Sequence, residues 1–461
     1  MEVKSKRHLR IRGPFDCEKG LPYTEIQNGD KRIENCTPIS PERTGLGLRL
    51  SNLALHKIKL VRRVPWILER ISRNMNVPDS YPAEEELKEE KLKMDTLIIG
   101  SGLSGLFALN RTNGLLVTNE LFTDIFDDPT NTNGELLHKS KEIIKSNAER
   151  IISGDFLGKF SEGYLVRTKG KIIMISPSRI VFAVGARYLP PIFEGNDYPN
   201  VISRRLYLKR ISNYKKVIVL GSFDDAIKTA LLSNAKILTP RGVRLFSKKY
   251  IELAENKGLE IEEVEWLRVK LERRKLSVKW EKGDQVVDAL VFAPVKQPRL
   301  EAMANAGCDY KFYPNMGTYL PNHEMDGYMR SCGHFAVGGA RGIWDEEMSA
   351  LSGEAPFDAE KAERLANLLK ETPLHQYYTN SLVAMKSPYF YSSGGYSCLC
   401  EDVLWKDVEE VMKMGYDNVE LLKRVGGLGL GECQGKVCTY VTGSIISSQK
   451  LITFRSPLYP V

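Results

Sequence analysis

The sequence predicts an α/β fold with two Rossmann-like dinucleotide-binding domains followed by a small helical domain. Three observations carry this prediction. A buried strand, a glycine-rich turn and a helix start follow one another at Met94–Leu109, and a second strand, turn and helix begin at Lys215. The last 70 residues contain two close pairs of cysteines. Strands that alternate with helices are typical of parallel sheets covered by helices on both faces.

Length and composition restrict the class of protein. The chain has 461 residues, of which 42% are hydrophobic and 27% charged, values typical of a globular protein with several domains. The longest apolar run, Leu97–Leu109, is too short for a transmembrane segment and is interrupted by glycine. The basic N-terminus lacks the apolar core of a secretory signal, so we expect a cytoplasmic protein with reduced thiols. The net charge of +8 is spread along the chain, and no nucleic-acid partner is expected.

The order of motifs divides the chain into four predicted parts. The charged run at Ala83–Lys93 is expected to be a solvated helix or connector. The parts are an N-terminal extension of unassigned role (1–90), a first dinucleotide-binding domain (91–200 and 300–375), a second, degenerate one (201–299), and a C-terminal cysteine domain with its tail (376–461).

The first glycine turn has the spacing of a dinucleotide-binding motif. Gly100, Gly102 and Gly105 form G-x-G-x-x-G between a strand and a helix, which lets a pyrophosphate approach the backbone at the helix N-terminus. Glu120 follows the next predicted strand, where a carboxylate would accept hydrogen bonds from a ribose. The alternative interpretation is a tight turn that holds no ligand.

The second glycine turn is altered. After the strand it keeps Gly221, but Phe223 and Asp224 occupy positions where further glycines are expected, and a second acid, Asp225, follows them. Two carboxylates would repel a pyrophosphate. We therefore expect this half to keep the fold and to bind a nicotinamide dinucleotide poorly or not at all.

Several motifs together resemble one family of flavoproteins. They are "IIGSGLSGL", then "FAVGARYLPPIFEGNDYPNVIS", and finally the four-cysteine tail. In this order they resemble the α subunits of heteromeric sarcosine oxidases, dye-linked proline dehydrogenases and opine or cyanide-forming amine dehydrogenases. These subunits look like disulfide-reductase-type flavoproteins, and the likeness covers residues from about 94 to 445.

The resemblance implies both partners and cofactors. A separate catalytic β subunit would carry the FAD that oxidises the amine, FMN would lie at the subunit interface, and further small subunits could join. The first dinucleotide site would hold FAD or another adenine nucleotide, lined by Gly185, Gly338 and Gly339 as well as the G-x-G-x-x-G turn. The family's G-D segment reads Gly338-Gly339-Ala340 here, and the missing Asp tells against tight FAD binding.

The four C-terminal cysteines are the candidate metal ligands. Cys398, Cys400, Cys433 and Cys438 give C-x-C-x32-C-x4-C, which resembles the bacterioferritin-associated-ferredoxin-like domain that binds a [2Fe-2S] cluster. Two predicted helices would bring the pairs together: "EDVLWKDVEEVMKMG", with acids in its first turn, and "DNVELLKRVGG", which opens with an Asp417/Glu420 capping pattern. A zinc site is the alternative, although C-x-C spacing is unusual for zinc.

The remaining cysteines and the histidines show no ligand spacing. Cys17, Cys36, Cys308 and Cys332 are expected to be small buried thiols, and His334 a structural histidine near the first domain. No C-x-x-C follows the first glycine motif, so thiol-disulfide reductase chemistry lacks its nucleophile. No catalytic nucleophile and base pair is evident.

The function expected from these patterns is electron transfer within an oxidoreductase. The chain would be the α subunit of an FAD-dependent amino-acid or secondary-amine dehydrogenase, in the cytoplasm or attached to a membrane through partners. Amine oxidation would occur on the partner, and this chain would relay electrons through [2Fe-2S]. Two alternatives stay open: a self-sufficient NAD(P)H-dependent flavin oxidoreductase, and a scaffold subunit with a vestigial nucleotide site.

Overall fold

The computed structural model describes most of the chain beyond residue 87. The described residues are 88–119, 126, 128–130, 133–198, 200–272, 275–314, 316–370, 372, 387–399, 401, 403–431 and 433–458. The backbone of four short strands is also described: β1 (Glu2–Lys4), β2 (Leu9–Ile11), β3 (Ile26–Asn28) and β4 (Lys31–Ile33). The rest of the predicted N-terminal extension, with Cys17 and Cys36, lies outside the described residues.

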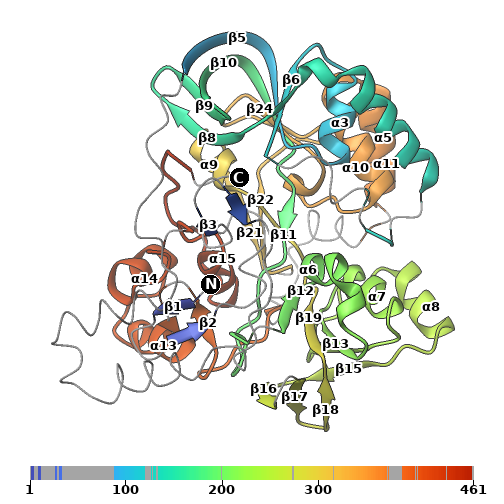
Figure 1. The fold of residues 1–461 in the computed structure, drawn as a ribbon, viewed down its shortest axis with the longest axis vertical. Helices are drawn as coiled ribbons and strands as arrows, with labels where there is room; N and C mark the ends of the chain where they lie inside the picture. Colours follow the sequence, from blue (N-terminus) through green and yellow to red (C-terminus); the bar gives the residue numbers. More distant parts are fainter. Residues whose placement is uncertain are drawn as a thin grey trace.

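The first large sheet has eight strands, in the order β23-β24-β10-β5-β6-β7, with β9 and β8 joined beside β10. Its central strands are parallel, whereas β8 and β9 form an antiparallel extension. The helices α3, α5, α10 and α11 gather on one side of it (Figure 1). The strands are β5 (Lys88–Ile99), β6 (Leu115–Thr118), β7 (Ile151–Ser153), β8 (Asp155–Phe160), β9 (Gly163–Thr168), β10 (Lys171–Phe182), β23 (Tyr328–Met329) and β24 (His334–Ala336). The helices are α3 (Leu103–Leu109), α5 (Gly134–Ser146), α10 (Glu346–Glu354) and α11 (Ala359–Lys370).

Strand β5 begins earlier than the sequence indicates. Lys88–Lys93, expected to be part of a solvated helix or connector, is the exposed first half of β5 and pairs in register with β10. The ion pair between Lys171 and Glu90 lies along this paired segment. The expectation was wrong because the conformation is imposed by a partner strand, which local charge does not reveal.

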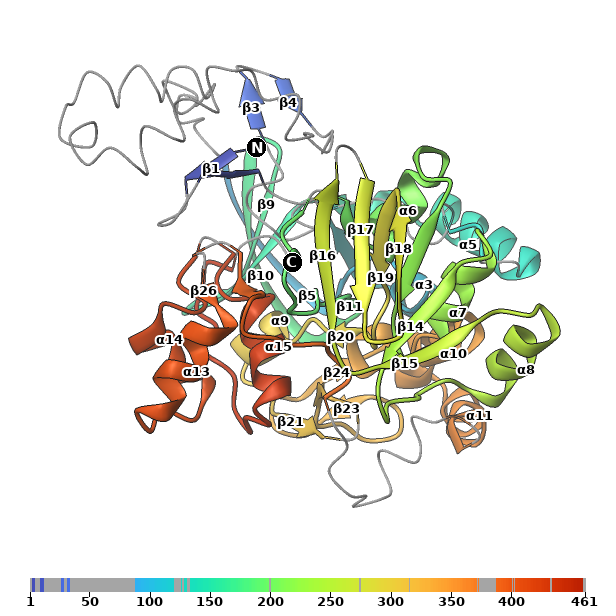
Figure 2. The ribbon, with the colours of Figure 1, turned by 90° about the horizontal axis from the view of Figure 1, so that it is seen from below.

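The second sheet has five parallel strands in the order β12-β19-β13-β14-β15. A separate antiparallel sheet of β16, β17 and β18 lies beside it, as the view from below shows (Figure 2). The strands are β12 (Val201–Ser203), β13 (Val217–Leu220), β14 (Lys236–Pro240), β15 (Ile261–Val264), β16 (Leu267–Glu272), β17 (Lys275–Trp280), β18 (Gly283–Val287) and β19 (Ala289–Phe292). The helices are α6 (Arg204–Lys209), α7 (Asp224–Leu231) and α8 (Lys248–Asn256).

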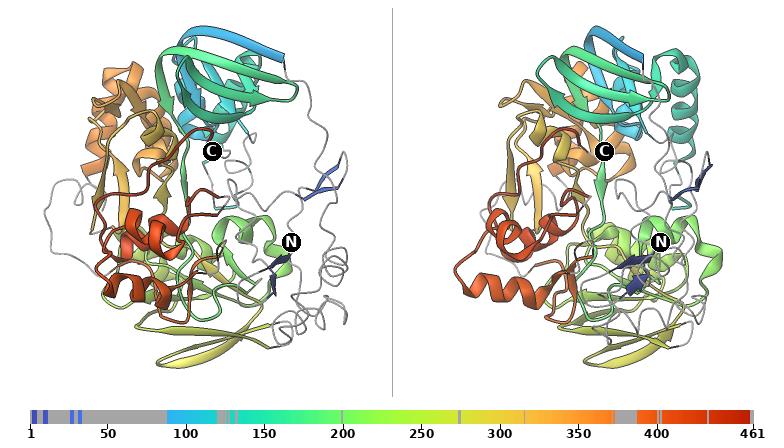
Figure 3. Two further views of the ribbon diagram at one scale, coloured as in Figure 1. Left: turned by 90° about the vertical axis from the view of Figure 1, so that its left-hand side faces the viewer. Right: turned by 60° about the vertical axis from the view of Figure 1, so that its left-hand side comes forward.

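The C-terminal part is mainly helical and packs against the first sheet and its connections (Figure 3). One continuous core contains Leu97 and Phe182 of the first sheet together with Leu422 and Tyr440 of the C-terminal helices. The C-terminal elements are β25 (Tyr396–Cys398), β26 (Val403–Leu404), α13 (Trp405–Lys413), α14 (Val419–Gly426) and α15 (Cys438–Ile445). The connecting elements are β11 (Ala186–Arg187), β20 (Gln297–Pro298), α9 (Glu301–Asn305), β21 (Tyr310–Tyr313) and β22 (Thr318–Pro321). Short 3-10 turns are η5 (Ala148–Arg150), η6 (Ile211–Asn213), η7 (Gly338–Arg341) and η8 (Ala355–Phe357).

These sheets confirm the predicted fold class. The first sheet is parallel at its centre and the second is parallel throughout; both are flanked by helices, as in Rossmann-type folds, and they are joined to a small helical C-terminal part. No helix among the described residues is long and apolar enough to cross a membrane.

Two of the cysteines depart from the expectation of reduced thiols. Cys308 and Cys332 form a disulfide whose Cα atoms are 4.9 Å apart, linking the approach to β21 with the turn between β23 and β24. The 24-residue separation carries no recognisable pattern, because only the folding of the intervening strands brings the two residues together.

Candidate functional site

The first glycine turn is as tight as the motif predicts. Gly100 has φ +106°, and a Cβ on it would lie 2.3 Å from the carbonyl oxygen of Ala183. A Cβ on Gly105 would lie 2.0 Å from the carbonyl oxygen of Gly100. Only glycine fits these two positions, so the chain can turn sharply from β5 into α3.

The turn opens into a cavity of about 310 Å³ bounded by residues from both large sheets. Gly100, Gly102, Gly185 and Gly339 line this cavity, as the sequence predicts for a cofactor site. Gly105 is behind the lining, where it permits the turn. Glu120, the predicted ribose partner, lies outside the described residues.

Gly338 supports the cavity from behind. A Cβ on it would lie 2.3 Å from Oγ of Ser104, so its role is the close packing of η7 against α3. Ser101 and Thr118, which the sequence reasoning missed, both line the cavity, and their hydroxyl oxygens are 2.8 Å apart. The two hydroxyls join the first turn to the end of β6, next to the place predicted for a ribose.

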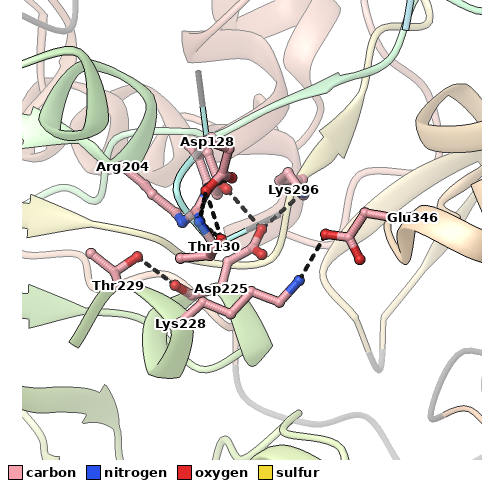
Figure 4. Close-up of polar contacts among 9 residues, drawn as sticks. Asp128, Thr130, Arg204, Asp225, Lys228, Thr229, Lys296 and Glu346 are labelled. Carbon is pink, nitrogen blue, oxygen red and sulfur yellow. Dashed lines mark hydrogen bonds and ion pairs between the residues drawn. The ribbon is translucent and has the colours of Figure 1, made fainter. Parts of the chain in front are cut away.

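Charged residues form much of the opposite wall, and Figure 4 shows how they pair. Arg204, at the start of α6, is 5% exposed and donates to both carboxylate oxygens of Asp128, at 2.8 and 3.1 Å. It also donates to the hydroxyl of Thr130 at 2.7 Å. Asp128, which precedes α5 of the first sheet, is thereby linked across the cavity to Arg204 of the second sheet.

Asp225 is a buried carboxylate that lines the cavity. It is 6% exposed, and its Oδ2 accepts from Nζ of Lys296 at 2.9 Å and from the hydroxyl of Tyr188 at 2.7 Å. Burial alone would raise the pKa of Asp225, but Lys296, Arg204 and Lys228 hold that pKa well below its usual range. The carboxylate is therefore ionised and neutralised by the protein itself.

Two further contacts link the second sheet to α10 and to the residues just before it. Nζ of Lys228 is 3.4 Å from Oε1 of Glu346, and the rings of Phe223 and Trp344 meet edge to face with centroids 5.0 Å apart. Burial raises the pKa of the neighbouring Asp224 to about 6, although its Oδ1 accepts from the backbone N–H of Ser247 at 2.7 Å. Phe223 and Asp224 of the altered second turn therefore contact other residues of the protein, Trp344 and Ser247.

Three of the four predicted metal ligands are described, and all are buried. Cys398 ends β25, Cys433 lies in the loop before α15 and Cys438 begins that helix; they are 1%, 1% and 2% exposed. Cys400 lies outside the described residues. Among the residues that the structure describes, no three His, Cys, Asp or Glu side chains form a group that could hold a metal ion.

The loop that contains Cys433 and Cys438 is rich in glycine. Gly429 and Gly435 have φ +76° and +75°, and a Cβ on either would lie within 3 Å of Cγ2 of Thr439. The two glycine turns therefore pack against each other and against Thr439, the residue after Cys438.

The predicted helical hairpin is present as α13 and α14. Asp407 caps α13 by accepting from the N–H of Leu404 at 2.9 Å. The cap of α14 is Asn418, whose side chain accepts from the N–H of Leu421, rather than the predicted Asp417. Gly427, with φ +76°, ends α14 as the sequence indicates.

A buried ion pair joins the cavity to the cysteine loop, and sequence reasoning missed it. Arg187 of β11 donates to Oε1 of Glu301 at 2.7 Å and to the carbonyl oxygen of Lys436 at 2.5 Å. Lys436 lies between the two loop cysteines and is 1% exposed; burial lowers its pKa to about 7, against the opposing effect of Glu301. No signal in the sequence links these distant positions.

His334 does not line the cavity. Its Nε2 is 3.0 Å from the hydroxyl of Tyr164, and its ring lies 6.0 Å from that of Phe182. Burial lowers its pKa. These contacts agree with the structural role expected for it.

Comparison with known proteins adds three findings. By sequence, no curated protein matches the chain. In fold, the chain is similar to L-proline dehydrogenase from P. horikoshii, with a TM-score of 0.59 and 23% identity over 83% of this chain and 80% of that one. Thioredoxin reductase from T. acidophilum has a TM-score of 0.46 and 12% identity, over 60% of this chain and 99% of that one. Residues 393–461 match the family model of the sarcosine oxidase A3 domain, so the C-terminal part of the chain is similar to that domain.

Proposed function

We propose that the chain is the electron-transferring α subunit of a heteromeric, FAD-dependent dehydrogenase of amino acids or secondary amines. A flavoprotein subunit of the amino-acid oxidoreductase type is supported by the sarcosine oxidase match and by the fold shared with L-proline dehydrogenase. The observation that carries the proposal is the combination in one chain: a glycine-lined cavity between two Rossmann-type sheets lies beside a loop of buried cysteines.

The cavity is the proposed site of an adenine nucleotide, either FAD or a smaller one. The glycine turn would take the pyrophosphate, and the polar end of β6 would face the ribose. Arg187 and Arg204 would face the distal part of the ligand, since both are permanently charged and line the cavity. FMN at a subunit interface remains part of the proposal.

The four thiolates of Cys398, Cys400, Cys433 and Cys438 are the proposed ligands of a [2Fe-2S] cluster. Such a group, when bound, stores and passes on single electrons. This chain would hold it away from water between glycine turns, with the N-terminus of α15 favouring its negative charge. The amine would be oxidised on a partner that carries FAD, in the cytoplasm or at a membrane reached through partners.

A second candidate function is a self-sufficient NAD(P)H-dependent flavin oxidoreductase. The second glycine turn opposes it, since Asp225 and Lys296 pair where a nicotinamide dinucleotide would need room and positive charge. Reduction of the purified chain by NAD(P)H without a partner would favour this function. A scaffold role is the third candidate, and it would apply if substrate and the partner flavin subunit together left the cluster oxidised.

Metal and sulfide analysis of the purified complex tests the central proposal. We expect two iron and two acid-labile sulfide per chain, as in a [2Fe-2S] group, loss of both in Cys433→Ser and Cys438→Ser, and an unchanged content in the matched double variant Cys308→Ala/Cys332→Ala. Stoichiometric zinc without sulfide would overturn the cluster. Absence of a co-purifying flavin subunit would overturn the heteromeric assembly.

A further inference from the structure

The disulfide between Cys308 and Cys332 connects two well-packed elements. Cys308 follows α9, where its N–H donates to the carbonyl oxygen of Met303 at 2.9 Å. Cys332 lies in the turn between β23 and β24, where its N–H donates to the carbonyl oxygen of Met329 at 3.2 Å. Both methionines are buried and belong to one hydrophobic core. The disulfide is therefore attached to fixed parts of the fold at both ends.

The two segments that the disulfide joins meet again at the wall of the cavity. Upstream of Cys308, the N–H of Arg299 donates to the carbonyl oxygen of Gly185 at 3.1 Å. Downstream of Cys332, Gly339 packs so closely that a Cβ on it would lie 3.2 Å from Cα of Gly185. Arg299, Gly185 and Gly339 all line the cavity. The disulfide and the contacts at Gly185 therefore close a ring of chain, with the sulfur atoms at one end and the cavity wall at the other.

Noncovalent contacts hold the sulfur end of this ring less firmly. The N–H of Asp309 donates to the hydroxyl of Ser331 at 2.8 Å, and this hydrogen bond is exposed to solvent. β24 pairs with β10 at two positions, through Phe335 and Ala336. A hydrogen bond makes a modest net contribution to stability, whereas a covalent link limits how far two segments can separate. We therefore expect the disulfide to be the main constraint at this end of the ring.

The two cysteines differ in exposure, which determines where a thiol would attack. Cys332 is partly exposed, whereas Cys308 is 4% exposed. Reduction needs two equivalents of an external thiol. One thiolate attacks Sγ of Cys332 and breaks the S–S bond, which releases Cys308 as a thiolate that takes up a proton. A second thiolate then releases Cys332 from the mixed disulfide and leaves as an external disulfide, and a low-molecular-weight disulfide reverses both steps.

We propose that the disulfide between Cys308 and Cys332 is a redox-sensitive brace of the cavity. The intact disulfide holds Arg299 and Gly339 against Gly185 in the arrangement that a ligand meets. After reduction the two segments can separate, and the same ligand binds less tightly. The inference rests on the proposed function, because it needs a nucleotide in the cavity. In a reducing compartment, the kind we expect for this chain, disulfides typically respond to redox conditions.

The coupling acts in both directions. If reduction weakens binding of a nucleotide by some factor, bound nucleotide must make reduction less favourable by the same factor. Coupling between two sites of a protein typically changes affinity by at least about five-fold, and we expect an effect of this size. A ligand with equal affinity for both forms would leave the thiol-disulfide equilibrium unchanged.

The test uses the purified full chain with its partners and ADP-ribose as a probe that undergoes no redox reaction. Affinity is measured by calorimetry with and without dithiothreitol, at a temperature where circular dichroism shows both forms folded. The disulfide is followed by alkylation and peptide mapping in glutathione buffers, with and without saturating ADP-ribose. We expect reduced wild type to bind ADP-ribose about five-fold more weakly. The bound probe should raise the midpoint of reduction, expressed as [GSH]²/[GSSG], by the same factor.

Two variants separate the brace from other effects of a reductant. Cys308→Ala/Cys332→Ala lacks the disulfide and keeps the other cysteines, so it should bind ADP-ribose with the affinity of reduced wild type whether or not dithiothreitol is present. Ser331→Ala removes the hydrogen bond from Asp309. It should leave the affinity of the oxidised protein unchanged and lower that of the reduced protein further, and an equal effect in both forms would contradict the brace.

The remaining outcomes distinguish failure of the brace from failure of the proposed function. If the linked peptides are found and ADP-ribose binds equally well in both forms, the brace is wrong while the nucleotide site stands. Full alkylation of both thiols in the native protein would likewise overturn the brace alone. An equal response of the double alanine variant to dithiothreitol would assign the effect to other cysteines. If ADP-ribose binds in neither form, the nucleotide site falls and the brace falls with it.

Discussion

Oδ2 of Asp225 accepts a hydrogen bond from Nζ of Lys296 at 2.9 Å, and the same oxygen accepts from the hydroxyl of Tyr188 at 2.7 Å. Asp225 is the second residue of α7, directly after the altered glycine turn of the second sheet. In a nucleotide-binding turn the helix N-terminus faces a phosphate. Here the carboxylate of Asp225 lies at the N-terminus of α7, and its counter-ion is Lys296, which lines the same cavity.

Replacing Asp225 tests whether this ion pair stabilises the contact between the sheets. Asp225→Asn leaves the mostly buried Lys296 without its carboxylate, and we expect the free energy of unfolding to fall by about 3 kcal/mol in urea titrations. Adding Lys296→Met should recover part of the loss, because the unpaired charge is then removed. Glu347→Gln, which breaks the exposed pair with Arg364, is the control and should change stability by no more than about 0.5 kcal/mol. An equal effect of Glu347→Gln would contradict the assignment.

For the neighbouring Asp224 we expect the opposite effect, because its replacement should raise the free energy of unfolding. Burial raises its pKa to about 6, above the ordinary value of 3.8, so the folded state prefers the protonated acid. Ionisation of Asp224 therefore costs stability as pH rises through about 6, and stability returns as pH falls toward 4. Asp224→Asn removes this charge and keeps an oxygen for the N–H of Ser247. We expect it to stabilise the fold by about 2 kcal/mol at pH 8 and by almost nothing at pH 4. A constant difference across this range would show that the carboxyl does not titrate with a raised pKa.

The glycine motif could be predicted from sequence because its spacing within one strand, turn and helix is distinctive. The contact that requires Gly105 is local, with the carbonyl oxygen of Gly100, whereas Gly100 is also required by the distant carbonyl oxygen of Ala183 at the end of β10. The cavity wall could not be predicted in the same way. Asp225 was recognisable as an acid that would repel a pyrophosphate, but its partner Lys296 comes from a segment about 70 residues later. The pairing depends on the order of strands in the sheet.

Two other features that the sequence did not predict also depend on contacts between distant parts of the chain. Lys88–Lys93 has the charge of a solvated segment, yet it forms a strand because it pairs with the first half of β10. Arg187 and Glu301 are separated by more than 100 residues, and each belongs to a short element with no distinctive pattern. Contacts of long sequence separation decide these positions, so local propensity and periodicity contain little information about them.

The disulfide between Cys308 and Cys332 makes stability depend on redox conditions. It closes a loop with a sequence separation of 24, for which chain entropy gives about 3.5 kcal/mol. We expect a reducing agent to lower the melting temperature of wild type and to leave that of Cys308→Ala/Cys332→Ala unchanged. Peptide mapping after alkylation without reduction should recover the linked peptides. Full alkylation of both thiols in the native protein would show that the disulfide does not form.

Gly102 offers the sharpest test of ligand binding at the first turn. Its φ of −65° suits alanine, and a Cβ on it would meet no atom of the protein within 4 Å, so Gly102→Ala should fold with unchanged stability. The added methyl group enters the cavity where a pyrophosphate would approach the backbone, and we expect the affinity for FAD or ADP-ribose to fall at least about ten-fold by calorimetry. Gly134→Ala is the matched control, because its Cβ is equally free and it does not line the cavity. Unchanged affinity in Gly102→Ala, with intact folding, would mean that no pyrophosphate lies against this turn.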